Sequence, residues 1–217
     1  MRFDDRRHAG QELGVRLLEW AADGDLTDAI VLALPRGGVP VAAEVARALH
    51  VPMDVLVVRK IGAPGAPEVG IGAIVGEDPP VFDRLALEVL GLDDSEFAAE
   101  VAMERLELHR RDDLYRGGRP EPQVQGRTVI LVDDGLATGI TARAALRHLR
   151  RQNPGRLVLA VPVCASRSAV ELKAEADDLM CLHQPHNFQS VGQWYADFGQ
   201  VSDQEVLETL RGLSSTV

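Results

Sequence analysis

Hydrophobic residues follow two alternating patterns along the chain. Short, nearly continuous apolar runs have the composition of buried β-strands, at residues 29–34, 54–58, 128–132, 157–163 and 179–182. The segments between several of these runs have helical periodicity or the length of a connecting helix, at residues 39–49, 139–151 and 166–176. Because strands alternate with helices, the sequence predicts an α/β fold with an open, mainly parallel, twisted sheet flanked by helices.

Further helices are predicted outside this alternation. Residues 7–20 carry apolar side chains at helical spacing, residues 82–91 are typical of a short helix, and residues 202–213 of a last one. Asp93 with Glu96 three residues later resembles a capping box, which predicts a helix that runs to about residue 115.

A break in the pattern follows the strand at residues 54–58. Residues 61–72 hold three glycines and two prolines between positions 62 and 70, directly after the cationic pair Arg59 and Lys60. Clusters of glycine and proline are typical of loops, so we expect a mobile loop here. A short strand is expected to overlap its end, at residues 71–75.

Composition narrows the class of protein. The 217 residues are 46% hydrophobic, which is enough for a core, yet every apolar run is far shorter than the roughly 20 residues of a membrane span. The charged start has no apolar segment behind it, which predicts no secretory signal and a cytoplasmic protein. The net charge of −10 argues against a nucleic-acid surface and favours a small-molecule partner.

Cysteine and histidine offer no strong metal or disulfide signal. Cys164 and Cys181 have no second pair nearby, so we expect two reduced, buried thiols. His183 and His186 lack a third ligand at a plausible spacing. The motifs of P-loop nucleoside triphosphatases and α/β-hydrolases are also missing from the sequence.

Two adjacent carboxylates end the apolar run at residues 128–132. Asp133 and Asp134 are followed by Thr138, Gly139, Ile140 and Thr141, which open the next predicted helix. Backbone N–H groups and the positive dipole end of a helix start bind phosphate, while a glycine allows close approach. Carboxylates instead need hydroxyls or a metal ion, so this segment combines anion recognition with sugar recognition.

The string VILVDDGLATGIT, residues 129–141, resembles the signature of type I phosphoribosyltransferases that binds 5-phosphoribosyl-1-pyrophosphate (PRPP). The resemblance implies that Asp133 and Asp134 contact the ribose hydroxyls. It also implies that the 5′-phosphate lies on the loop residues Ala137, Thr138, Gly139, Ile140 and Thr141.

Two weaker signals stand where that family would have them. Pro35, Arg36, Gly37 and Gly38 follow the first strand and resemble the pyrophosphate loop. Arg59 and Lys60, before the loop at residues 61–72, resemble the cationic pair and flexible lid of adenine and orotate phosphoribosyltransferases. Glu68 in that lid is a candidate general base.

The resemblance also implies a domain plan. Residues 1–217 would form a single domain with a core at 29–182, a helical insertion at 83–116 and a small variable hood from 1–20 and 183–217. The hood would hold the acceptor, and we expect a planar heterocycle stacked on Trp194 or Tyr195, although such aromatic residues more often belong to a core.

The acceptor itself stays open. Hypoxanthine-type members carry an acid where this chain has Ala137, which disfavours them without establishing an adenine enzyme. The oligomeric state is likewise open, a homodimer included.

The expected activity is transfer of the phosphoribosyl group from PRPP to a nitrogen acceptor, with release of pyrophosphate. Arg36, Lys60, Asp133 and Asp134 would be the catalytic residues, and Mg²⁺ would be bound mainly through PRPP, which explains why the sequence holds no metal cage. A rival interpretation is a regulatory protein that senses PRPP without turnover, because fold does not determine function.

Overall fold

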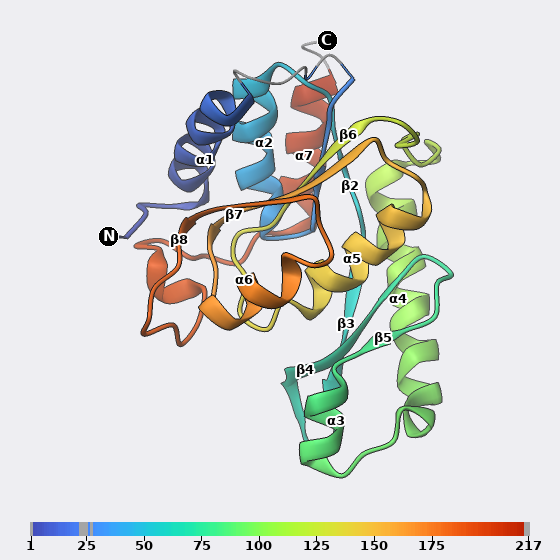
Figure 1. The fold of residues 1–217 in the computed structure, drawn as a ribbon. Coiled ribbons are helices and arrows are strands. Elements are labelled where there is room, and N and C mark those ends of the chain that lie inside the picture. The colour runs from blue at the N-terminus through green and yellow to red at the C-terminus, as the bar shows by residue number, and fades with distance from the viewer. Residues whose placement is uncertain (1, 22–25, 27, 215–217) are drawn as a thin grey trace.

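The chain is built around a five-stranded parallel sheet in the order β2-β1-β6-β7-β8 (Figure 1). The structure, a computed structural model, describes residues 2–21, 26 and 28–214. The strands are β1 (Ile30–Ala33), β2 (Met53–Val55), β6 (Thr128–Val132), β7 (Arg156–Val163) and β8 (Asp178–His183). The predicted sheet, flanked by helices, is therefore confirmed.

Each face of this sheet has its own apolar core. Alternate residues of β6, such as Ile130 and Val132, pack toward α1 (Arg6–Ala21), α2 (Gly38–Leu49) and α7 (Asp203–Ser214). The residues between them pack toward α5 (Ile140–Arg151) and α6 (Ser166–Leu172) on the opposite face. Burial on both faces explains why these strands are continuous apolar runs.

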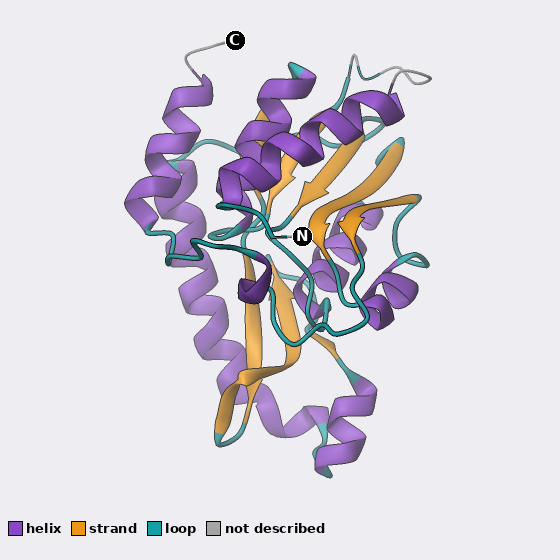
Figure 2. Cartoon of the chain, turned by 90° about the vertical axis from the view of Figure 1, so that its left-hand side faces the viewer, coloured by secondary structure: helices purple, strands orange, loops and turns teal. Residues whose placement is uncertain are grey.

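A second unit, which we call the arm, projects from one end of the sheet (Figures 1 and 2). It comprises a three-stranded antiparallel sheet and the helices beside it: β3 (Val58–Ala63), β4 (Ala66–Val75), β5 (Val81–Phe82), α3 (Arg84–Leu90), the 3-10 helix η1 (Asp94–Phe97) and α4 (Ala98–Arg116). Asp93 and Glu96 form the predicted capping box at the start of η1.

The prediction of a mobile loop at residues 61–72 is wrong, because most of that segment is a β-hairpin. β3 and β4 pair antiparallel, with Ile61 opposite Gly72, and Pro64 lies in the turn between them. Ile61 and Ile71 are buried, so apolar residues anchor both strands despite the glycines. The strand expected at residues 54–58 is likewise split, since β2 ends at Val55 and β3 begins at Val58.

Residues near the N-terminus pair with the C-terminal tail. The Phe3 amide donates to the Trp194 carbonyl at 2.8 Å, and the Ala196 amide donates to the Phe3 carbonyl at 2.8 Å. Phe3 and Tyr195 are fully buried with their ring centroids 5.5 Å apart. Among the described residues, no helix is both long and apolar enough to cross a membrane.

Candidate functional site

The acid pair lies where the chain reverses its direction of travel across the sheet. From β1 the chain turns outward to β2, whereas β6 lies on the other side of β1 and leads to β7. Such a switch point leaves a crevice at the carboxyl ends of the two central strands. The Leu34 amide donates to the Val132 carbonyl at 2.9 Å, so the loops after β1 and β6 start side by side.

The loop after β6 is held by its backbone, and its middle residues stay exposed. The Leu136 amide donates to the Val163 carbonyl at 2.9 Å, and the Leu136 carbonyl accepts from the Ala165 amide at 2.9 Å. Ala137 and Thr138 are exposed between this anchor and α5. The loop is therefore rigid at its base and accessible to a ligand at its tip.

Gly139 is the residue before α5, and its φ of +72° requires a left-handed backbone that favours glycine. It has no side chain to cap the helix, whose first N–H groups lack intrahelical partners. The five signature residues from Ala137 to Thr141 thus surround an uncapped helix start. This arrangement suits an anion.

The glycine turn after β1 lies directly against the acid pair. A Cβ on Gly37 would stand 2.1 Å from Asp134 Oδ2, and a Cβ on Gly38 would stand 2.8 Å from the Val132 carbonyl oxygen. A side chain at either position would force these neighbouring atoms to shift. Pro35, Arg36, Gly37 and Gly38 are thus brought together with Asp133 and Asp134, although they are almost 100 residues apart in sequence.

Burial sets the charge state of the two acids. Desolvation raises the pKa of Asp133 well above its ordinary range, and the neighbouring Asp134 charge adds to this effect. Desolvation also raises the pKa of Asp134, but the Arg6 guanidinium opposes that rise. Arg6 Nε donates to Asp134 Oδ2 at 2.8 Å. Sequence reasoning missed Arg6, which lies 128 residues from Asp134 in a start that appeared only charged.

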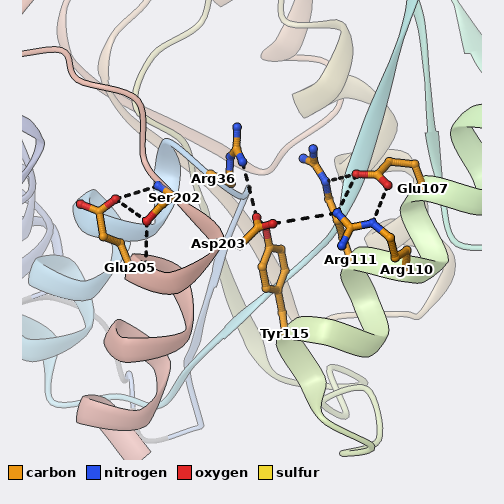
Figure 3. A network of polar contacts seen from close by, with 8 residues as sticks. All are labelled: Arg36, Glu107, Arg110, Arg111, Tyr115, Ser202, Asp203 and Glu205. Atoms are coloured by element: carbon orange, nitrogen blue, oxygen red, sulfur yellow. Dashed lines mark hydrogen bonds and ion pairs between the residues drawn. The ribbon is translucent and has the colours of Figure 1, made fainter.

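Arg36 belongs to a polar network that joins α4 to α7 (Figure 3). Its Nη1 lies 3.5 Å from Asp203 Oδ1, which also accepts from the Tyr115 hydroxyl at 2.5 Å. Burial raises the pKa of Tyr115, so the phenol stays a donor, and its hydrogen bond lowers the pKa of Asp203. Asp203 is therefore a fixed anion beside Arg36 that the sequence did not reveal.

The same network carries more cationic charge on α4. Arg110 Nη2 lies 3.9 Å from Asp203 Oδ2, and Arg110 and Arg111 both donate to Glu107. The hydrogen bond from Arg110 lowers the pKa of Glu107 to about 2, so Glu107 remains ionised. Three arginines thus share two carboxylates near the turn after β1.

Arg59 and Lys60 are adjacent on β3 and therefore face opposite sides of the strand. Arg59 turns to α4, where its Nε donates to Glu104 Oε2 at 2.7 Å. A Cβ on Gly70 would stand 2.8 Å from Lys60 Cδ and 3.4 Å from Ile140 Cγ2, so the Lys60 stem lies near the start of α5. Of this cationic pair, Lys60 alone approaches the candidate phosphate site.

The expected acceptor residues have different surroundings. Tyr195 is fully buried between Phe3 and Phe198, so the expected stacking of a heterocycle on its ring is wrong. Its hydroxyl donates to the Asp134 carbonyl at 2.6 Å, which makes it a support of the acid pair. Trp194 is partly buried, and its indole nitrogen is a buried donor for which the described residues provide no hydrogen-bond partner.

Other sequence-level candidates contribute less to the site. The side chain of Glu68 lies outside the described residues. Cys164 is buried and Cys181 is half-buried, and both are free thiols. The described residues contain no group of three or more His, Cys, Asp or Glu side chains placed to hold a metal ion, His183 and His186 included.

Comparisons with known sequences assign the chain to a family. The profile described as "Phosphoribosyl transferase domain" matches residues 8–198. Two Mycobacterium tuberculosis proteins, from strains CDC 1551 and H37Rv, carry the name "Putative phosphoribosyl transferase". Each is 41% identical over 208 residues, which cover 96% of this chain and 46% of the relative. The chain thus spans about half the length of these curated relatives.

Comparisons with solved structures support the fold. The crystal structure of TT1426 from Thermus thermophilus is 42% identical, with a TM-score of 0.80 over 98% of this chain and 99% of that one. The AQ2163 protein from Aquifex aeolicus is 10% identical, with a TM-score of 0.55 over 86% of this chain and 78% of that one. The second likeness is one of fold alone.

Proposed function

The chain belongs to the phosphoribosyl transferase family, and we propose that it transfers the 5-phosphoribosyl group of PRPP to a nitrogen acceptor and releases pyrophosphate. The observation that carries the proposal is that three elements lie at one edge of the sheet. They are the buried acid pair, the uncapped start of α5 and the glycine turn that touches Asp134. A phosphorylated sugar needs these features together.

Each element has a part in binding PRPP. The 5′-phosphate would lie on the N–H groups at residues 137–141, where the helix dipole favours negative charge. Asp133 and Asp134 would accept hydrogen bonds from the ribose hydroxyls. The turn at residues 35–38 would present backbone N–H groups to the pyrophosphate.

Transfer breaks the bond from ribose C1 to a pyrophosphate oxygen and forms a bond from C1 to the acceptor nitrogen, which gives up its proton. Negative charge gathers on pyrophosphate as C1 becomes cation-like, so donors near that group lower the barrier. Arg36, in the turn after β1, and Lys60, on β3, are the proposed donors. The base that takes the acceptor proton is unassigned, with Glu68 a candidate.

Mg²⁺ would reach this site mainly as part of its PRPP complex. The described residues offer two adjacent carboxylates and no cluster of three metal ligands, which suits an ion whose ligands are mostly substrate oxygens and water. When bound, Mg²⁺ would supply positive charge to the pyrophosphate group.

The acceptor is proposed to be a small planar heterocycle under the hood. Trp194 remains the aromatic candidate, because its indole nitrogen is a buried donor that a ring nitrogen or carbonyl of the acceptor could satisfy after a local rearrangement. As a separate point, we propose that the reaction takes place in the cytoplasm.

A PRPP sensor without turnover is the second proposed function. The observation in its favour is that Arg36 and Arg59 each pair with a carboxylate, Asp203 and Glu104, instead of standing ready for a leaving group. A sensor would need the sugar and phosphate contacts but no developing charge at C1.

The test is to incubate the chain with PRPP, Mg²⁺ and a panel of nucleobases while pyrophosphate release is followed. Base-dependent release that saturates with PRPP supports the transferase. Saturable PRPP binding by calorimetry with no turnover on any base supports the sensor. Absence of PRPP binding contradicts both.

A further inference from the structure

Arg6 makes a buried contact with the second acid of the signature. Its Nε donates to Asp134 Oδ2 at 2.8 Å, and the two side chains are only 12% and 13% exposed. Arg6 therefore occupies one oxygen of Asp134 and leaves the second, Oδ1, for a ligand.

The hood fixes the Arg6 guanidinium at further points. Its Nη1 donates to the Gly199 carbonyl at 2.7 Å, and its central carbon lies 3.9 Å from the centroid of the Phe198 ring. A guanidinium that stacks on an aromatic face and donates two directed hydrogen bonds has little freedom. The tail also contacts Asp134 directly, because the Tyr195 hydroxyl donates to the Asp134 carbonyl.

Within the part of the chain that the structure describes, the groups that face Asp134 include only one cation. Asp133 adjoins it at the end of β6, the neutral Tyr195 phenol approaches from the tail, and Arg6 approaches from α1. The turn after β1 presents the backbone of Gly37, while Arg36 is turned toward Asp203. Two adjacent buried carboxylates without a cation tend to share one proton.

We propose that Arg6 is a positioning residue of the ribose subsite, which orients the Asp134 carboxylate and keeps it charged for the hydroxyls of PRPP. This inference rests on the proposed binding of PRPP at the acid pair. It assigns the start of α1 a role in the ribose subsite beyond building the hood.

The test is calorimetry of PRPP with Mg²⁺ at a series of pH values from about 5.5 to about 9, a range chosen to bracket the raised pKa of a buried carboxyl. The variants are Arg6→Gln, which removes the charge, and Arg6→Lys, which keeps it. Arg7→Gln is the matched control, since Arg7 is adjacent but 70% exposed and its ion pair, with Glu44, is 3.5 Å long. Melting temperatures confirm that each variant is folded.

We expect Arg6→Gln to move the acid midpoint of PRPP binding upward by about 1–3 pH units, the usual effect of losing an opposite charge at this distance. Binding should weaken by about tenfold for each pH unit below the new midpoint and approach that of the wild type at about pH 9. Arg6→Lys should restore most of the original midpoint, and Arg7→Gln should not move it.

Three results would overturn the inference while leaving PRPP binding intact. They are an unchanged midpoint in Arg6→Gln, an equal loss of affinity at every pH, and tighter binding at every pH, which would mean that Arg6 blocks the site. Absence of binding by the wild type would instead defeat the proposed function. If Arg6→Gln does not fold, Phe198→Leu provides the test, because it loosens the guanidinium and should shift the midpoint in the same direction by a smaller amount.

Discussion

The two sides of the candidate site are built in different ways. On the proposed sugar and phosphate side, residues 133–141 form one continuous segment, from the loop after β6 to the start of α5, whose backbone is hydrogen-bonded to the end of β7. On the proposed pyrophosphate side, Arg36 comes from the turn after β1 and Lys60 from β3, and Arg36 pairs with Asp203 on α7. The first side is organised before a ligand binds, whereas on the second Arg36 must exchange an internal ion pair for a ligand contact.

This difference indicates which residues should determine the affinity for PRPP and which should determine the rate of transfer. Contacts that exist before the ligand arrives contribute affinity at little cost in reorganisation. Contacts that must form as charge develops contribute to the rate. Substitutions on the two sides should therefore affect different measured quantities.

The largest effect is expected at Lys60. Lys60→Ala should leave PRPP binding nearly intact and lower turnover by about 10²–10³, the usual result of losing one donor to developing charge. Arg59→Ala is the matched control, because Arg59 faces α4 and pairs with Glu104. Steady-state kinetics and calorimetry separate the two quantities. Equal turnover in Lys60→Ala and the wild type would remove Lys60 from the mechanism.

The next effect concerns the organised side. Thr138→Val should weaken binding of PRPP and of ribose 5-phosphate by about 1–3 kcal/mol, the cost of a lost hydrogen bond to a charged group. Asp134→Ala should weaken the sugar contacts, so its loss should be larger for ribose 5-phosphate than for inorganic phosphate. Unchanged affinity in both variants would mean that PRPP does not bind at this loop.

A change in stability should accompany the loss of an acid. Because burial raises the pKa of Asp133 in the folded state, the folded protein holds that proton more tightly than the unfolded chain. Its stabilising contribution is complete below the ordinary pKa of about 3.9 and is lost as pH rises through the folded-state pKa.

Asp133→Asn should therefore raise the melting temperature at about pH 8 more than at about pH 4, while PRPP binding falls. Thermal unfolding at the two pH values tests this. A variant that is less stable than the wild type at the higher pH would show that Asp133 is not a strained, buried acid.

The smallest effect is expected at Asp203. Its contact with Arg36 is partly exposed and 3.5 Å long, so it contributes about 0–1 kcal/mol. Asp203→Asn should release Arg36 and tighten pyrophosphate binding by up to about fivefold, the upper end of that range. The same substitution in an Arg36→Gln background should change nothing. Weaker pyrophosphate binding in the single variant would mean that Asp203 positions Arg36 instead of competing for it.

The arrangement of a strand, two acids and a helix start could be predicted because it is local. An apolar strand, two acids and a helix start follow one another at residues 128–141, so short-range rules place them at one edge of the sheet. The pairing of β1 with β6 then brings the glycine turn to the same edge, as the parallel alternation implied.

The rest depended on contacts between distant segments. Nothing near Arg6 indicates that it meets Asp134, and nothing near Asp203 indicates that it meets Arg36 and Tyr115. The β3–β4 hairpin was hidden for another reason, since glycine and proline gave its turn and β4 the composition of a loop. Tyr195 was a candidate for stacking on the acceptor, yet its ring is buried against Phe3 and belongs to the core.

The central claim is that PRPP binds across the acid pair and the start of α5. Its most direct test is a crystal structure of the chain with PRPP and Mg²⁺. The account predicts the 5′-phosphate on the N–H groups of residues 137–141 and the ribose hydroxyls on Asp133 and Asp134. The claim would be contradicted by a 5′-phosphate bound to the arginines of α4. In that result, Asp134 would still contact Arg6, and no ribose hydroxyl would contact either acid.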